Sequence, residues 1–387
     1  MYVRSLFLIS FFVSGILLFS QVVPAAHRMD QYVNLLSGKR TGIVANEASL
    51  VNGVQIVDTL IRRGVLIKKI FCPEHGFRLR VDAGQSLPDG IDGPTGIPIV
   101  SLYGRKVKPY SQDLKGLDIM IFDIQDVGVR CYTYLSTLTY VMEACAEQRL
   151  PLMILDRPNP NGFYIDGPVL QMDHASFVGM HPVPLVYGMT VGEYARMVNG
   201  EGWLNKGIQC DVIVIPLSGY AHHLQIAIQV PPSPNLTTMN AIYLYPSLCL
   251  FEGTPVSVGR GTHTPFEIFG HPALKGFSFS FTPVSIPGMS THPPFEGQLC
   301  RGLDLQAFYQ HHGKMFGRIN LSWLLMAFRD LGSDPAFFKP FFDQLAGTDS
   351  LRKQIMTGKT EFQIRASWQE GIKKFSEIRG KYLLYPE

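Results

Sequence analysis

The sequence predicts an α/β protein in which a mostly parallel sheet forms a first domain and a smaller α+β domain follows it. Short apolar runs alternate with amphipathic stretches from Thr41 to about Ile215, the pattern of strands joined by crossover helices. The pattern changes after the rigid, turn-rich stretch 229–235, and the remainder is rich in Phe, Pro and Gly. We therefore predict a first domain at 27–230 and a second domain at 231–387.

The individual elements follow from apolar runs and from helical periodicity. Short apolar runs between turn residues predict strands at Gly42–Val44, Leu66–Cys72, Ile97–Leu102, Leu117–Phe122, Leu152–Leu155 and Val212–Ile215. Amphipathic patterns predict helices at Gln55–Arg63, Thr133–Glu147, Val191–Asn199, Leu321–Leu331 and Glu361–Arg379. The third helix is preceded by Thr190 and carries Glu193 in its first turn, the signature of a capping box.

The first 26 residues have the features of a secretory signal. Arg4 precedes an apolar stretch from Leu6 to Phe19, and small residues at Ala25 and Ala26 predict cleavage near that point. A retained anchor is the alternative, although the apolar run is shorter than the ~20 residues that span a bilayer. We therefore expect an exported protein, periplasmic or secreted, with no stable membrane anchor after signal removal.

Composition excludes several classes of partner and cofactor. The formal net charge of the 387-residue chain is +3 and its basic residues are scattered, so nucleic acid is not an expected partner. Six cysteines lie mostly in apolar runs without paired or zinc-site spacing, which favours buried free thiols over a disulfide framework. Phosphate-binding, dinucleotide-binding, Gly-x-Ser-x-Gly and His-Glu-x-x-His motifs are absent, so we expect neither a cofactor nor a metal. The oligomeric state stays open.

Polar residues follow three of the predicted strands. Pro73-Glu74-His75-Gly76 follows the strand Leu66–Cys72, and two further groups follow the strands that end at Phe122 and Leu155. These groups are Asp123, Gln125, Asp126 and Arg130, and then Asp156, Arg157 and Asn159. Right-handed crossovers would place all three groups at one edge of the sheet, where ligands of such sheets bind. Carboxylates, a histidine and arginines together indicate a hydrolytic site for a polar, anionic substrate.

Paired carboxylates suit the hydrolysis of an acetal, which needs an acid for the leaving oxygen and a second group opposite it. Glu74 is the candidate acid, with His75 orienting it or contacting substrate, and Asp123 or Asp126 is the candidate partner. Structural alternatives stay open. The aspartates after the strand would then only order a turn, and Asp156 would only brace its loop through an ion pair with Arg157 or Arg130.

Two further segments are candidates for substrate contacts. Tyr132, in a group of tyrosines near the start of a predicted helix, would either stack on a sugar ring or pack in the core. Phe251-Glu252-Gly253-Thr254 and Gly259-Arg260-Gly261-Thr262 form a glycine-rich polar region that would either close over the site or serve only as structure.

These motifs together carry a resemblance to a known family. The chain resembles the exo-β-N-acetylmuramidases of bacterial peptidoglycan turnover, long catalogued as a domain of unknown function, DUF1343. The matching motifs are Pro73-Glu74-His75-Gly76, Thr95-Gly96-Ile97-Pro98, Ser101-Leu102-Tyr103-Gly104, Phe122-Asp123-Ile124-Gln125-Asp126-Val127-Gly128, Leu155-Asp156-Arg157-Pro158-Asn159-Pro160, Pro232-Ser233-Pro234-Asn235, Leu250-Phe251-Glu252-Gly253-Thr254, Gly259-Arg260-Gly261-Thr262 and Ala366-Ser367-Trp368-Gln369-Glu370-Gly371. They run through nearly the whole chain after the signal.

The resemblance implies a Rossmann-like domain, a smaller carboxy-terminal domain and a catalytic cleft between them. It also implies release of N-acetylmuramic acid from the non-reducing ends of peptidoglycan fragments, with Glu74 at the position of the proposed catalytic glutamate. An arginine would recognise the lactyl carboxylate of that sugar. The expected substrate-binding residues are Gln85, which replaces the usual glutamate of the family, and Gln125, Arg130, Tyr132, Asp156, Arg157, Asn159, Asn235, Glu252 and Arg260.

Two other functions remain as alternatives. A metal-dependent hydrolase would use Glu74, His75, Asp123 and Asp126 as ligands. A non-catalytic protein of the same fold would bind muropeptides without turning them over.

Overall fold

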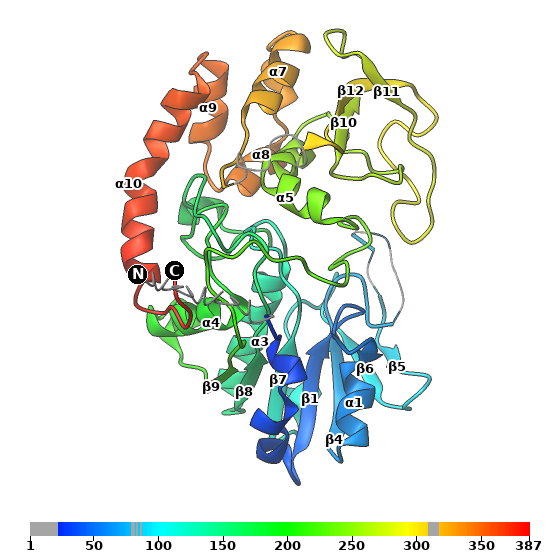
Figure 1. The fold of residues 1–387 in the computed structure, drawn as a ribbon, viewed down its shortest axis with the longest axis vertical. Helices are drawn as coiled ribbons and strands as arrows, with labels where there is room; N and C mark the ends of the chain where they lie inside the picture. Colours follow the sequence, from blue (N-terminus) through cyan, green and yellow to red (C-terminus); the bar gives the residue numbers. More distant parts are fainter. Residues whose placement is uncertain (1–21, 79–81, 83, 86, 309–316) are drawn as a thin grey trace, which may run out of the picture.

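The structure is a computed structural model that describes residues 22–387 apart from 79–81, 83, 86 and 309–316 (Figure 1). A seven-stranded sheet with the order β5-β6-β4-β1-β7-β8-β9 forms the centre of the first domain. Its neighbouring strands pair in parallel, except that the edge strand β5 is antiparallel to β6. The strands are β1 (Arg40–Ala45), β4 (Leu66–Cys72), β5 (Gly90–Ile91), β6 (Pro98–Ser101), β7 (Ile119–Asp123), β8 (Leu152–Leu155) and β9 (Val212–Ile215). The predicted mostly parallel, Rossmann-like sheet is confirmed.

Both faces of this sheet are covered, so its strands are apolar on both sides. Val44 and Phe122 belong to one apolar cluster, whereas their neighbours Ile43 and Ile121 belong to another on the opposite face. This alternation is the two-residue period of a β-strand, and burial of both faces explains why the strands appear as continuous apolar runs. The helices of this domain are α1 (Ile56–Arg62), α2 (Ser111–Leu114), α3 (Tyr134–Glu147) and α4 (Val191–Gly200), and a small hairpin joins β2 (Leu50–Val51) to β3 (Val54–Gln55).

The predicted capping box at the start of α4 is present. The Thr190 side chain accepts the Glu193 backbone N–H, and the Glu193 side chain accepts the Thr190 backbone N–H. The two side chains satisfy amide groups that have no partner within the first turn of a helix. All six cysteines are buried and unbridged, as expected from their apolar surroundings.

The second domain contains a three-stranded antiparallel sheet and most of the remaining helices. The sheet has the order β10-β12-β11, with β10 (Ile268–His271), β11 (Phe279–Phe281) and β12 (Cys300–Asp304). The helices are α5 (Met239–Leu248), α7 (Ser322–Asp330), α8 (Pro340–Ala346), α9 (Ser350–Met356) and α10 (Glu361–Arg379). Figure 1 shows this domain above the carboxyl ends of the parallel strands, with α10 running along the side of the molecule toward α4.

The carboxyl-terminal residues after α10 pack against the first domain. The Tyr385 hydroxyl donates to Asp156 at 2.5 Å, and the Leu384 backbone N–H donates to Glu193 at 2.8 Å. One apolar cluster also contains both Phe122 of the first sheet and Phe342 of the second domain. The two domains therefore pack closely against each other, and the carboxyl terminus of the chain returns to the first domain.

The segment at the predicted signal cleavage point is part of the fold. Residues 1–21 of the predicted signal lie outside the described residues. Val23 forms a β-bridge with Ser218, the Ala25 backbone N–H donates to the Asp156 carbonyl at 3.0 Å, and both Ala25 and Ala26 are fully buried. Cleavage near Ala25 or Ala26 would remove these contacts. Within the described part of the chain, no helix has the length and apolar character needed to cross a bilayer.

Candidate active site

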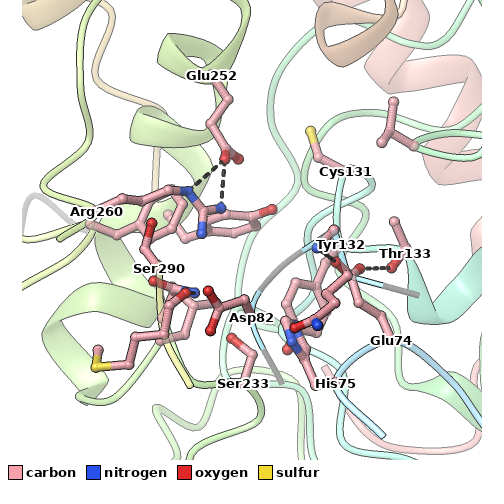
Figure 2. Close-up of a pocket in the computed structure, with 18 of the residues that line it drawn as sticks. Glu74, His75, Asp82, Cys131, Tyr132, Thr133, Ser233, Glu252, Arg260 and Ser290 are labelled. Carbon is pink, nitrogen blue, oxygen red and sulfur yellow. Dashed lines mark hydrogen bonds and ion pairs between the residues drawn. The ribbon is translucent and has the colours of Figure 1, made fainter. Parts of the chain in front are cut away.

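A cavity of about 790 Å³ lies between the carboxyl edge of the sheet and the second domain (Figure 2). Turns that follow β4 and β6 contribute Glu74, His75 and Tyr103, and the segment before α3 contributes Tyr132 and Thr133. The second domain contributes Asn235, Glu252, Arg260 and the stretch from Met289 to His292. Ligands of doubly wound sheets bind outside the carboxyl ends of the strands, and this cavity is at that position.

The Pro73–Gly76 turn holds Glu74 at the mouth of β4. The Gly76 backbone N–H donates to the Pro73 carbonyl at 3.2 Å, which closes a four-residue turn directly after the strand. His75 occupies the third position of this turn with φ +74°, a conformation that normally favours glycine. A non-glycine residue at positive φ costs on the order of 1–3 kcal/mol and is typical of functional sites. The strain supports a role for His75 beyond packing.

A second turn meets Glu74 from the segment that follows. The Gln85 backbone N–H donates to the Asp82 carbonyl at 3.2 Å, and Gly84 at the third position has φ +80°. The Gly84 backbone N–H donates to Glu74 Oε1 at 2.9 Å. Glycine suits this position because the turn requires positive φ, so the local backbone both closes the turn and directs an amide at the catalytic candidate.

Two hydroxyl groups complete the surroundings of the Glu74 carboxylate. Thr133, just before α3, donates to Glu74 Oε2 at 3.1 Å. Tyr103, after β6, lies beside Glu74, and burial, with a smaller contribution from Glu74, raises the pKa of the Tyr103 hydroxyl above its usual value. Tyr103 therefore stays protonated and able to donate. These contacts fix the orientation of Glu74 from three different elements.

The opposite wall of the cavity carries a paired arginine. Arg260 Nη2 and Nε lie 2.7 and 3.3 Å from Glu252 Oε1, and the guanidinium lies 5.2 Å from the centre of the Phe266 ring. Burial opposes the charge of Arg260, but the neighbouring Glu252 raises its pKa, so the guanidinium stays charged. Gly259 and Gly261 flank it at φ +78° and +80°, and this backbone positions the arginine in the cavity.

Asn235 contributes a polar atom without an internal partner. Its amide Nδ2 donates to the Met289 carbonyl at 3.0 Å, whereas its Oδ1 has no hydrogen-bond partner among the described residues. The side chain is 3% exposed and lines the cavity. Since buried polar atoms are normally satisfied, an unpaired Oδ1 at this position is suited to a donor on a ligand.

Comparisons with known proteins agree with this architecture. Profiles described as the N-terminal and C-terminal parts of exo-beta-N-acetylmuramidase NamZ match residues 41–240 and 243–385. The peptidoglycan beta-N-acetylmuramidase NamZ of Bacillus subtilis is 36% identical over 377 residues, which cover 92% of this chain and 89% of that protein. The chain belongs to the exo-β-N-acetylmuramidase family.

Solved structures extend the likeness to the whole fold. A DUF1343 family protein of Bacteroides fragilis is 46% identical, with a TM-score of 0.88 over 95% of this chain and 100% of that chain. A second DUF1343 family protein of the same organism is 26% identical, with a TM-score of 0.80 over 94% of this chain and 99% of that chain. The exo-β-N-acetylmuramidases are glycoside hydrolases, which accords with a cavity lined by carboxylates.

Seven of the site residues predicted from the sequence line the cavity. They are Glu74, His75, Gln85, Tyr132, Asn235, Glu252 and Arg260. The other seven are used in internal contacts outside it. They are Asp123, Gln125, Asp126, Arg130, Asp156, Arg157 and Asn159. The strands that precede them end at one edge of the sheet, as expected, but these side chains do not line the cavity, which corrects their expected role as site residues.

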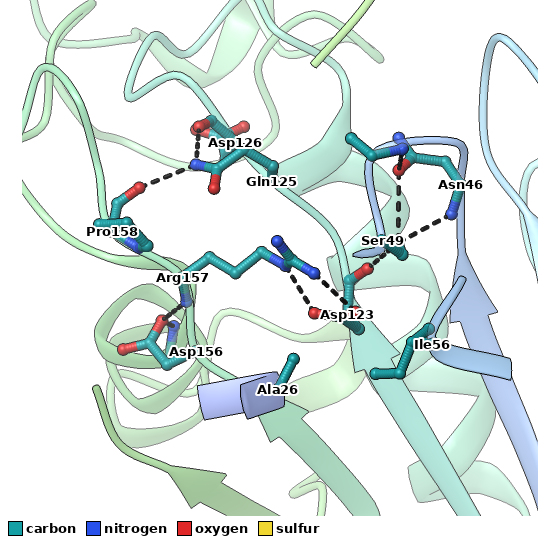
Figure 3. A network of polar contacts seen from close by, with 12 residues as sticks. Ala26, Asn46, Ser49, Ile56, Asp123, Gln125, Asp126, Asp156, Arg157 and Pro158 are labelled. Atoms are coloured by element: carbon teal, nitrogen blue, oxygen red, sulfur yellow. Dashed lines mark hydrogen bonds and ion pairs between the residues drawn. The ribbon is translucent and has the colours of Figure 1, made fainter. Parts of the chain in front are cut away.

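Asp123 and Arg157 form a buried ion pair instead of a catalytic group (Figure 3). Arg157 Nε and Nη2 lie 2.5 and 2.8 Å from the two carboxylate oxygens of Asp123, which is fully buried. The alternative of an ion pair between Asp156 and Arg157 or Arg130 is therefore wrong, because Asp123 is the partner of Arg157. Strand alternation explains this, because Asp123 lies on the same face as Ile121 and Arg157 follows Leu155 of that face.

The remaining predicted residues outside the cavity also have local partners. Asp126 accepts the Gly128 backbone N–H and the Tyr187 hydroxyl, and Asp156 accepts Thr190 and Tyr385. Arg130 donates to three backbone carbonyls, those of Pro168, Val183 and Leu345. Gln125 donates to the Asp126 and Pro158 carbonyls, and Asn159 donates to the Met189 carbonyl. These contacts stabilise loops and the domain boundary.

The lining residues that were not predicted from the sequence include Asp82, Tyr103 and Thr133. Tyr103 and Thr133 lie in recognised motifs or next to them, but only the folded chain shows that they contact Glu74. The four ligands of the metal-dependent alternative are not brought together, and the described residues contain no group of three or more His, Cys, Asp or Glu side chains arranged to hold a metal ion.

Proposed function

We propose that this protein is an exported exo-β-N-acetylmuramidase that releases N-acetylmuramic acid from the non-reducing ends of peptidoglycan fragments. The observation that carries the proposal is the cavity in which Glu74 of the first domain faces Arg260 of the second. A carboxyl group for acid catalysis and a cation for substrate recognition are both needed for a sugar that itself carries a carboxylate. The family membership and the Bacillus subtilis relative support the same substrate class.

Glu74 acts as the general acid in this mechanism. It delivers a proton to the glycosidic oxygen as the bond to the anomeric carbon breaks, which a positioned carboxyl group accelerates by about 10²–10⁴. The contacts from Gly84, Thr133 and Tyr103 hold the carboxyl in one orientation. His75, in the same strained turn, contacts the substrate or supports Glu74.

Arg260 selects the muramic sugar. The lactyl carboxylate distinguishes N-acetylmuramic acid from N-acetylglucosamine, and a charged, partly buried guanidinium recognises it with directional hydrogen bonds. Arg130 and Arg157 were equal candidates from the sequence, but both are buried with internal partners. Arg260 lines the cavity with its side chain 21% exposed. The Asn235 Oδ1 atom supplies an acceptor for a substrate N–H or hydroxyl.

Export is the second part of the proposal, because the substrate is outside the cytoplasm. The apolar stretch from Leu6 to Phe19 after Arg4 supports it. The packing of Val23, Ala25 and Ala26 supports a cleavage point upstream of Val22, because a cut there leaves these contacts intact.

The activity is tested with para-nitrophenyl β-glycosides of N-acetylmuramic acid and of N-acetylglucosamine, with Glu74→Gln beside the unmodified protein. We expect hydrolysis of the muramic glycoside alone and a loss of about 10²–10⁴ in kcat for the variant. Hydrolysis of the glucosamine glycoside alone, or an unaffected variant, would refute the proposal. Loss of activity in a chelator would favour the metal-dependent alternative, and tight binding without turnover would favour a muropeptide-binding protein.

A further inference from the structure

Hydrolysis of a glycoside requires a group that acts opposite the acid, and the two aspartates expected from the sequence are not in the cavity. The Asp123 carboxylate is hydrogen-bonded by Arg157, and the Asp126 carboxylate is hydrogen-bonded by Gly128 and Tyr187. The described residues that line the cavity include three carboxylates: Glu74, Asp82 and Glu252. The partner of Glu74 is therefore either Asp82 or Glu252, unless the substrate supplies it.

Glu252 is already committed to another contact. Its Oε1 accepts two hydrogen bonds from Arg260, and this pairing keeps the guanidinium charged and in place. If Glu252 took a proton during catalysis, it would lose the negative charge that pairs with the Arg260 guanidinium. Charge-assisted pairs of this kind are structural supports for the recognition of an anion.

Asp82 has the geometry of a free-standing base at the cavity wall. Its Oδ2 accepts the Thr291 backbone N–H at 2.5 Å, from the stretch between β11 and β12. Within the part of the chain that the structure describes, it forms no ion pair with a cationic side chain. Figure 2 shows its carboxylate beside Ser290, on the Arg260 side of the cavity.

The surroundings of Asp82 keep it ionised. Burial opposes the charge, but the hydrogen bonds from Thr291, the backbone of Gly288 and the nearby His292 together lower the pKa of Asp82 below its usual value. A carboxylate that accepts a proton during the reaction must begin in this ionised form. The turn that carries Asp82 also directs the Gly84 amide at Glu74, so one short segment positions both carboxyl groups.

We propose that Asp82 is the second catalytic carboxylate of this glycosidase, acting opposite Glu74. This inference rests on the proposed hydrolase function. As Glu74 donates its proton to the leaving oxygen and the bond to the anomeric carbon breaks, Asp82 takes a proton from the group that attacks this carbon. That group is water, which gives the free sugar directly. Alternatively it is the acetamido group of the substrate, whose oxygen closes on the anomeric carbon while its N–H proton moves to Asp82 and water later opens the ring.

Asp82 also has a structural role, because its bond to Thr291 joins the two domains. Asp82→Asn separates the roles, since its amide oxygen still accepts the Thr291 N–H while the charge and the base are lost. Asp89→Asn is the matched control. Asp89 likewise accepts a backbone N–H, that of Ser101 at 2.8 Å, and does not line the cavity.

The experiment measures hydrolysis of the para-nitrophenyl glycoside of N-acetylmuramic acid by the unmodified chain and these variants across pH. We expect Asp82→Asn to lower kcat by about 10²–10⁴ with KM within about threefold, and to remove the acidic limb of the pH profile. Asp82→Ala should regain at least about tenfold with added formate, which replaces the missing base. Asp89→Asn should stay within about twofold of the unmodified chain.

Two results would overturn the inference. One is Asp82→Asn retaining more than about a fifth of the activity, and the other is Asp82→Ala remaining unresponsive to formate. The formate response of Asp82→Ala can be measured even if Asp82→Asn folds poorly. In both cases the unmodified chain would still hydrolyse the muramic glycoside, so failure of this inference is distinguishable from failure of the proposed function.

Discussion

Replacement of Asp123 by asparagine is expected to weaken the fold and to leave the chemistry almost intact. The carboxylate of Asp123 holds the Arg157 guanidinium through two hydrogen bonds, at 2.5 and 2.8 Å, and both side chains are buried. The backbone carbonyl of Asp123 also accepts the Ser49 hydroxyl, which ties the end of β7 to the segment after β1 (Figure 3). Asparagine fits the same space, so the main loss is the charge that Arg157 requires.

The expected magnitude follows from the burial of the pair. Removing one partner of a buried ion pair leaves an uncompensated charge and costs about 3–5 kcal/mol in the free energy of unfolding. The unfolding entropy is about 2.1 cal/mol/K per residue, summed over roughly 365 residues. The same loss therefore lowers Tm by about 4–7 °C. Replacing both charges, with Asp123→Asn and Arg157→Gln together, should recover most of this loss because no unpaired charge remains.

The assay compares Tm by calorimetry with kcat on the muramic glycoside at 20 °C, well below unfolding. We expect the single variant to unfold at lower temperature while kcat stays within about threefold of the unmodified protein. A catalytic Asp123 would give the opposite pattern, with unchanged Tm and a kcat lower by about 10² or more. That pattern, or a double variant less stable than the single one, would refute our interpretation of the pair.

Three other outcomes are expected. Arg260→Lys should lower kcat/KM for the muramic glycoside by about 10–100-fold without improving that for the glucosamine glycoside, and a loss of the same size on both would contradict lactyl recognition. Burial raises the pKa of Asp126 to about 6 and of Asp156 to about 7. The folded chain thus keeps protons that the unfolded chain releases near pH 4, so these groups make unfolding free energy fall as pH rises from about 4 to about 7. Asp156→Asn should flatten this slope of unfolding free energy against pH, measured by chemical denaturation. An unchanged slope would contradict a raised pKa for Asp156. Export is a proposal, and it predicts that amino-terminal sequencing of the processed protein begins at or before Val22, whereas a chain that begins at His27 would contradict the proposed cleavage point.

Much of the fold was predictable because its strands are covered on both faces. The run Leu66–Cys72 is bounded by Gly64 and Pro73, and the structure has β4 with the same limits. The helix after Thr190 was equally clear, because its capping box is a local signal that does not depend on distant contacts. The second domain gave weaker signals, since its three short antiparallel strands have no long apolar runs.

The candidate site was only half predictable, because the sequence shows where a strand ends but not where each following side chain points. Glu74 and His75 were found from their strand end, whereas Asp123 and Arg157 turn to the opposite face of the sheet and pair there. Strand alternation carried a signal for this, since Asp123 shares the parity of Ile121. Asp82 had no comparable signal, because its position depends on a turn and on a contact with Thr291 more than 200 residues away.

Asp156 contacts segments near both ends of the part of the chain that the structure describes. Its carbonyl accepts the Ala25 backbone N–H, and its side chain accepts the Tyr385 hydroxyl. A ribosome must therefore release almost the whole polypeptide before the first domain can complete its contacts, and domains that need late residues cannot finish folding during synthesis. Delayed folding accords with the export that we propose for this chain. It also means that residues 27–230 expressed alone would lack both of these contacts and should fold poorly.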